Sequence, residues 1–147
     1  MTASSSTSAE IKQEEVFLRY IHLRKIKGRV IAEFRPSKNS KPIAKIGIKP
    51  EFFKMFAEVF RLEPVKTNEK EIIYVIDKDE VFDLALLYAC IIRTLRRNNN
   101  NIHKIIDAML NLHPFELTFW NYKLINARNW YEQNRIARAF LTIYGVR

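Results

Sequence analysis

The chain has 147 residues, of which 48% are hydrophobic, and a formal net charge of +9. This length and apolar content suit one folded domain with a buried core, and they exclude a chain that is disordered throughout. No apolar run approaches the ~18 residues that a membrane-spanning helix needs, so we expect no membrane partner. The Ser/Thr-rich start has nothing to bury. We therefore expect a disordered leader over residues 1–9 and a single domain over residues 10–147.

The charges are segregated along the chain. Residues 19–49 contain ten basic residues and one acidic residue, residues 50–83 have a net charge of −4, and residues 84–147 have a net charge of +6. Such segregation favours a polyanionic partner, above all nucleic acid, over an ordinary basic surface. The single cysteine, Cys90, excludes an intramolecular disulfide and is typical of a reducing compartment, so we expect a cytoplasmic or nucleoid-associated protein.

The first predicted element lies over residues 11–26. Thr7 and Glu10 have the spacing of a capping box, which predicts a helix that carries Phe17 and Ile21 inward. The later part of the same stretch also alternates between apolar and charged residues, which fits a strand. We favour the helix and keep the strand as the alternative.

A basic β-hairpin is predicted over residues 28–49. Apolar and charged residues alternate in two short runs, residues 28–35 and 44–49, around a turn rich in Pro, Ser and Asn. This alternation requires a sheet with one buried and one solvated face, and here the solvated face is cationic. A two-stranded ribbon fits the major groove of DNA, and long side chains in the turn reach phosphates. The candidate contacts are Arg29, Arg35, Lys38, Lys41, Lys45 and Lys49.

Helices dominate the rest of the chain. We predict a helix over 50–62, a strand over 71–76, a helix over 78–97 and a short helix over 102–112. Pro114 then begins a last long helix that runs to Tyr144. The fold class is therefore α+β, with a small antiparallel sheet built on the basic hairpin and a mostly helical C-terminal half. The expected core comprises Phe34, Ile46, Ile48, Phe56, Val59, Ile73, Val75, Leu87, Ile91 and Phe140.

A second cationic surface follows if the last helix is continuous. At 100° per residue, aromatic and guanidinium side chains interleave on one face, which suits phosphate binding and stacking on bases. The alternative is that the arginines only solvate the helix. The residues of this face are Trp120, Leu124, Arg128, Tyr131, Arg135 and Arg138.

Catalytic patterns are weak in this sequence. The three histidines lie far apart with no metal-ligand spacing, and the chain has only three glycines and no Gly-rich phosphate loop. The acidic residues between 77 and 83 lie at the start of a predicted helix, where carboxylates cap amides and match the helix dipole. We expect no metal site, no cofactor and no catalytic residue.

The order of elements resembles the LAGLIDADG homing-endonuclease fold over most of the chain. Residues 15–28 are similar to the family's helix that ends in a glycine, and residues 29–36 are similar to its first DNA-contacting strand and turn. Residues 50–62 and 71–97 follow in matching order. The resemblance implies a DNA-binding sheet and a dimer formed through the first helix.

One position departs from that family. Its acidic metal ligand stands just before the glycine, where this chain has Lys25, Ile26 and Lys27. A cation does not replace a carboxylate as a ligand of Mg²⁺, so the resemblance implies DNA binding without cleavage.

The sequence therefore predicts a non-catalytic nucleic-acid-binding protein, with DNA favoured over RNA and both cationic surfaces in contact with phosphates. The pattern is compatible with duplex DNA, single-stranded DNA and RNA. One alternative is a structural or interaction subunit of a nucleoprotein or virion-like assembly, present as a homodimer or a larger complex. A second alternative is a metal-dependent LAGLIDADG-like endonuclease that uses scattered carboxylates such as Glu33, Asp77 or Asp79.

Overall fold

A five-stranded antiparallel sheet forms the N-terminal half of the fold. The computed structural model describes residues 18–95 and 102–145. The strand order is β3-β2-β1-β5-β4, so β3 and β4 are the edges. The predicted α+β class is confirmed, because the strands precede most of the helices. The strands are β1 (Arg19–Ile26), β2 (Arg29–Arg35), β3 (Ala44–Gly47), β4 (Pro64–Thr67) and β5 (Glu71–Ile76).

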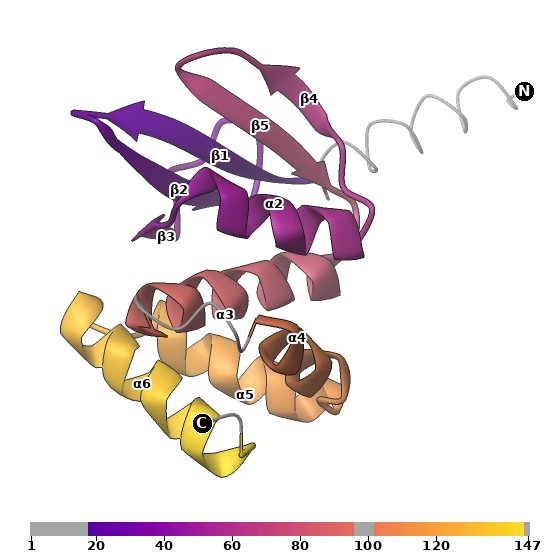
Figure 1. The fold of residues 1–147 in the computed structure, drawn as a ribbon, viewed down its shortest axis with the longest axis vertical. Coiled ribbons are helices and arrows are strands. Elements are labelled where there is room, and N and C mark those ends of the chain that lie inside the picture. Colours follow the sequence, from indigo (N-terminus) through magenta and orange to yellow (C-terminus); the bar gives the residue numbers. More distant parts are fainter. Residues whose placement is uncertain (1–17, 96–101, 146–147) are drawn as a thin grey trace, which may run out of the picture.

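The helices of the described residues all lie on one side of the sheet (Figure 1). Helix α3 lies between the sheet and a lower layer of three helices, which explains why its middle is apolar on all sides: every residue from Leu84 to Ile92 is buried. No helix in the described ranges is long and apolar enough to cross a membrane. The helices are α2 (Pro50–Val59), α3 (Asp79–Leu95), α4 (Ile102–Leu110), α5 (Pro114–Ile125) and α6 (Trp130–Ile143).

The predicted hairpin is confirmed as β2 and β3. The two strands pair antiparallel, with Glu33 opposite Lys45, and the alternate residues Ala32, Phe34 and Ile46 are buried against the helices. Strand β1 joins β2 through a tight turn in which Lys27 and Gly28 both have positive φ (52° and 78°). Two positive φ values in a two-residue connection match the twist of an antiparallel pair.

The predicted helix over residues 11–26 is wrong from Arg19 onward, where the chain forms β1. This strand pairs with β2 on one side and β5 on the other, so its backbone hydrogen bonds are satisfied by its neighbours. Ile21 and Leu23 are buried on the helix-covered face, as a strand period of two requires. The proposed capping box at Thr7 and Glu10, and the leader over residues 1–9, lie outside the described residues.

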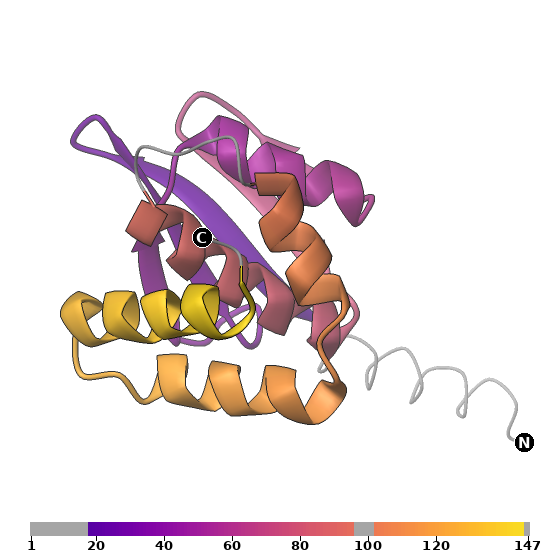
Figure 2. The ribbon, with the colours of Figure 1, turned by 60° about the horizontal axis from the view of Figure 1, so that its bottom comes forward.

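The predicted long helix over 114–144 is also wrong, because the chain breaks into α5 and α6 between residues 126 and 129. The Asn129 side chain accepts a hydrogen bond from the Glu132 amide at 3.0 Å and so caps a new helix. The two helices lie side by side beneath α3 (Figure 2), and Trp120 contacts Phe140 between them. The single helical face predicted for residues 120–138 therefore does not form.

Most of the expected core is confirmed. The exceptions are Val59, which is 45% exposed at the end of α2, and Ile73 and Val75, which are half-buried. Both β5 residues are half-buried because alternate positions of a strand point to opposite faces, and their neighbours Tyr74 and Ile76 occupy the helix-covered face. Residues 96–101, which include the junction between the predicted helices over 78–97 and 102–112, lie outside the described residues.

Candidate nucleic-acid interface

The structure divides the cations of the hairpin between its two ends. Lys38 and Lys41 are exposed in the loop between β2 and β3, whereas Arg29 lies at the opposite end of β2. Residues 29–35 extend over about 20 Å at the usual rise of a strand. The loop lysines and Arg29 therefore belong to different parts of the surface.

Arg35 supports the structure of the loop. Its guanidinium pairs with Glu33 at 2.7 Å and donates to the Ser40 carbonyl oxygen at 2.7 Å. Its Nε atom is buried without a partner in the described part of the chain. Arg35 is therefore half-buried and engaged, and of the predicted turn cations only Lys38 and Lys41 extend into solvent.

Glu33 lies at the centre of this cationic region. It is only 2% exposed, although it faces away from the helices, and Arg24 approaches it at 3.4 Å in addition to Arg35. Burial raises the pKa of the Glu33 carboxyl, but the hydrogen bond from Arg35 and the charges of Arg24, Arg35 and Lys45 lower it below its ordinary value overall. The Glu33 carboxylate is therefore ionised and holds two arginine side chains by ion pairs. This environment does not favour a role as a proton donor.

The break between α5 and α6 separates the residues predicted to share one helical face. Trp120 and Leu124 are buried, and Trp120 Nε1 donates to the Tyr144 hydroxyl at 3.1 Å. Arg128 lies in the connection and pairs weakly with Glu132 at 3.7 Å. The other three members, Tyr131, Arg135 and Arg138, are exposed on α6, where spacings of four and three residues align them.

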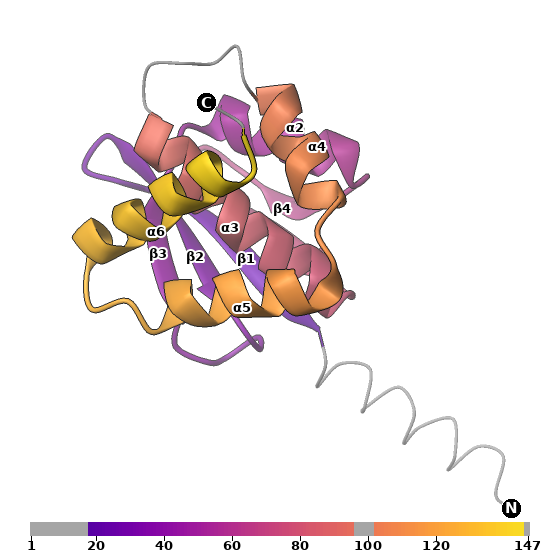
Figure 3. The same cartoon turned by 90° about the horizontal axis from the view of Figure 1, so that it is seen from below.

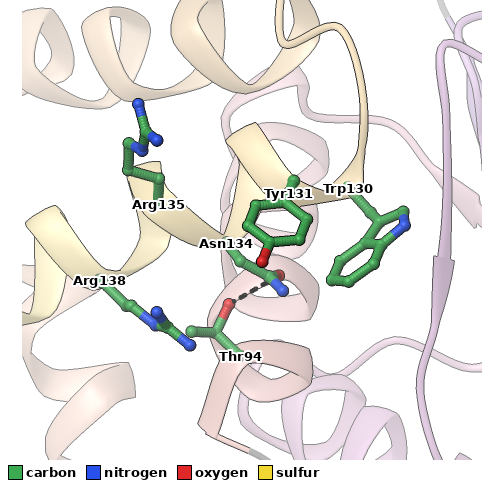
Figure 4. Close-up of a pocket in the computed structure, with 6 residues that line it drawn as sticks. All are labelled: Thr94, Trp130, Tyr131, Asn134, Arg135 and Arg138. Carbon is green, nitrogen blue, oxygen red and sulfur yellow. Dashed lines mark hydrogen bonds between the residues drawn. The ribbon is translucent and has the colours of Figure 1, made fainter.

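Two neighbouring hollows lie on the surface between α6 and the hairpin. The first, of about 420 Å³, lies over α6 and the end of α3 (Figure 4), and the second, of about 440 Å³, lies along the edge strand β3. Trp130 lines both. The first is lined by Thr94, Trp130, Tyr131, Asn134, Arg135 and Arg138, and the second by Arg29, Ile31, Lys45, Gly47, Ile48, Lys49, Phe52, Ile92, Arg93 and Trp130.

We call these two hollows together the basic groove. Seen from below, α6 lies close to the β3 side of the sheet (Figure 3), which brings residues 29–31, 45–49 and 130–138 to one surface. The groove unites six of the predicted site residues, which are Arg29, Lys45, Lys49, Tyr131, Arg135 and Arg138. It does not include Arg35, Lys38, Lys41 or Arg128.

The charged residues that line the basic groove are all cationic among the residues that the structure describes. Among the residues that the structure describes, its exposed cations Arg29, Lys45, Lys49, Arg135 and Arg138 form no ion pair. Five exposed like charges around a concavity repel one another, and an anionic ligand relieves that repulsion.

Arg93 is a groove residue that the sequence did not predict. Its Nε donates to Asn134 Oδ1 at 3.1 Å and one terminal nitrogen donates to Gln133 Oε1 at 2.9 Å. Asn134 also accepts from the Thr94 hydroxyl (Figure 4). These bonds attach the first turns of α6 to the end of α3 and thereby position Trp130 beside the hairpin.

Metal-ligating side chains and one buried cysteine are features of the described residues that bear on catalysis. No group of three or more His, Cys, Asp and Glu side chains in residues 18–95 and 102–145 is arranged to hold a metal ion. Burial raises the pKa of the Cys90 thiol to about 12, so it is not a thiolate nucleophile near neutral pH.

Comparison of the chain with protein-family models, with curated proteins and with solved structures found no match.

Proposed function

We propose that this protein binds nucleic acid without acting on it chemically, with DNA favoured over RNA, and that phosphates contact the basic groove. The observation that supports this most strongly is the set of five cations, Arg29, Lys45, Lys49, Arg135 and Arg138, which form no ion pair with a described residue and surround a concave surface lined by no described carboxylate. Lysine and arginine in this arrangement gain from phosphate binding mainly by releasing counterions. The absence of a disulfide agrees with a cytoplasmic or nucleoid-associated location.

The basic groove is the first contact surface in this proposal, and the loop lysines form a second, outlying one. Arg29, Lys45 and Lys49 approach from the hairpin, and Arg135 and Arg138 approach from α6. Arg35, which pairs with Glu33, holds the loop that carries Lys38 and Lys41 through its hydrogen bond to the Ser40 carbonyl oxygen. Contacts of this kind position a nucleic acid without reading its sequence.

A matched pair of charge reversals tests this assignment. Arg135→Glu with Arg138→Glu removes two groove cations, and Lys38→Glu with Lys41→Glu removes two loop cations with the same change in net charge. Binding to fluorescein-labelled duplex, single-stranded DNA and RNA is measured by anisotropy between 50 and 300 mM salt. The groove double variant should flatten the log–log salt slope by about 1.8 on duplex, and the loop variant by less than half of that.

Both double variants alter exposed side chains, so their melting temperatures should stay close to that of the parent. A larger effect from the loop variant would move the interface to the hairpin turn. No binding to any of the three nucleic acids at low salt would refute the function.

The metal-dependent endonuclease is the enzymatic rival. Two of the carboxylates proposed for a nuclease site are already engaged by arginines. Glu33 pairs with Arg35 and Asp79 pairs with Arg19, each at 2.7 Å. Incubation with supercoiled plasmid and Mg²⁺ or Mn²⁺ tests this directly. Nicking that one Asp or Glu substitution abolishes would replace our proposal with a nuclease.

A second candidate function, an interaction subunit, is favoured by an aromatic stripe on α5. Phe115, Phe119 and Tyr122 are 81%, 52% and 68% exposed, and their spacings of four and three residues place them on one side of the helix. Contiguous exposed aromatics are typical of protein contacts.

Light scattering after size exclusion tests this second candidate. A stable oligomer formed without nucleic acid and lost in the double variant Phe115→Ser, Phe119→Ser would support it, whereas a monomer would contradict self-association. Trp120→Ala is unsuitable for this test because Trp120 is buried.

A further inference from the structure

We propose that the basic groove takes single-stranded nucleic acid, with a base stacked on the side chain of Trp130 and a neighbouring base on Tyr131. This inference rests on the proposed function, since it names the form of nucleic acid that the same groove binds.

The first argument is the exposure of two adjacent aromatic rings. Trp130 is 55% exposed and Tyr131 is 68% exposed, and their ring centroids lie 4.9 Å apart at the start of α6. Large aromatic side chains are usually mostly buried in a soluble domain. Here both rings line the hollow over α6, and Figure 4 shows Tyr131 beside Asn134, with Trp130 on the side of Tyr131 away from Arg138. Exposed rings in a cationic hollow are the components of a stacking platform.

The second argument is the position of the cations relative to Trp130. Its indole lines both hollows, with Lys45, Lys49 and Arg29 around one and Arg135 and Arg138 around the other. A single strand that passes Trp130 therefore meets phosphate-binding groups on either side of the base that it stacks. This alternation of backbone contacts and a ring face is how proteins bind single strands without reading their sequence.

The third argument is the size of the concavity. The two hollows have volumes of about 420 and 440 Å³, which is the range of small-molecule pockets. A base of an intact duplex is already stacked between its neighbours and must be extruded to reach such a site, at a cost in unstacking. A single strand offers its bases without that cost, so the groove should prefer it.

Gly47 provides a way to fill the β3 hollow without changing any charge. It lines that hollow on the edge strand, and a Cβ atom added there meets no atom within 4 Å. The strand position also suits a β-branched residue. Gly47→Val should therefore fold normally and narrow the groove.

The test compares a 20-nucleotide oligo-dT with a 20-base-pair duplex at the same salt concentration, by anisotropy, for the parent, Trp130→Ala, Gly47→Val and the control Val65→Ala. Val65 is an exposed apolar residue on β4, at the sheet edge opposite β3. We expect the parent to bind the single strand at least about tenfold more tightly than the duplex. Trp130→Ala and Gly47→Val should each weaken oligo-dT binding by about tenfold with an unchanged salt slope, because no charge is lost. The control should behave as the parent.

Equal or tighter binding of the duplex, together with no effect of Trp130→Ala, would overturn this inference and leave nucleic-acid binding intact. Absence of binding to either probe would instead overturn the proposed function. Quenching of tryptophan fluorescence by oligo-dT gives an independent readout. The quenching should disappear in Trp130→Ala, because the other tryptophan, Trp120, is buried; quenching that persists there would contradict stacking on Trp130.

Discussion

Replacement of Asp83 by Asn should stabilise the protein at neutral pH. Asp83 lies in the second turn of α3, and its Oδ1 accepts a hydrogen bond from Asn121 Nδ2 at 2.8 Å. The pKa of this carboxyl is raised from 3.8 to about 6, and burial is the largest cause. The charges of Asp79 and Glu80 contribute to the rise, whereas the charge of Arg19 opposes it. The folded protein therefore holds a proton that the unfolded chain releases.

The sign of the pH dependence follows from that difference. Between about pH 4 and pH 6 the folded state binds more protons at Asp83 than the unfolded state, so this group lowers the stability as the pH rises through that interval. A change in pKa from 3.8 to about 6 corresponds to at most about 3 kcal/mol. Since the side chain is partly exposed, solvent screening reduces this to about 1–2 kcal/mol.

Asp83→Asn removes this cost and keeps the hydrogen bond, because an amide oxygen also accepts from Asn121. At pH 7.5 the variant should be more stable by about 1–2 kcal/mol, or about 3–6 °C in melting temperature, and the gain should vanish near pH 4. Urea unfolding followed by circular dichroism at both pH values measures this. Asp107→Asn, at an exposed position on α4, controls for the change in net charge. A variant that is destabilised at pH 7.5, or equally stabilised at both pH values, would refute the reasoning.

Three further substitutions test the core and the hairpin. Leu87→Asp should prevent folding, because it places an unpaired carboxylate on the fully buried face of α3; a soluble variant with a cooperative thermal transition would contradict this. Glu33→Gln should lower the free energy of unfolding by about 1–3 kcal/mol at pH 7, because it breaks the pair with Arg35. The lowered pKa means that this contribution is present above about pH 4.5 and is lost as the pH falls further, which urea titrations at pH 3 and pH 7 measure. Tyr88→Phe should cost about 1 kcal/mol in urea unfolding, because it removes the 2.6 Å hydrogen bond to the Phe52 carbonyl oxygen; an unchanged midpoint would contradict a role for this bond.

The hairpin was predictable from the sequence because its alternation leaves only one arrangement that buries Ala32, Phe34 and Ile46 together. Strand β1 was not predictable in this way, because only two buried apolar residues, Ile21 and Leu23, support its period of two. The same amino-acid sequence also fits one face of a helix. What selects the strand is pairing with β2 and β5, and the β5 pairing joins residues about fifty positions apart in the chain. Local pattern carries no information about such pairing.

The break between α5 and α6 did have a local signal. Asn129 and Glu132 have the spacing of a helix cap, and both halves are used: Asn129 accepts from the Glu132 amide, and the Glu132 carboxylate accepts from the Arg128 amide at 2.8 Å. With neither Gly nor Pro in the connection, the apolar periodicity on both sides predicts one continuous helix. That prediction puts Trp120 on the cationic face, whereas Trp120 is buried and Trp130 is 55% exposed.

The basic groove itself could not be predicted from any one segment. Its cations were identified individually, because charge runs are visible in the sequence, but their grouping depends on how α6 is attached to α3. Arg93 makes that attachment through Gln133 and Asn134, and it is 40 residues away from the helix that it holds. The same attachment brings Trp130 to the edge of β3, where Gly47 leaves room beside it. A cationic hairpin and a cationic helix thus become one surface because α6 packs against α3, with buried residues such as Ala137 and Phe140 and the hydrogen bonds of Arg93 all contributing.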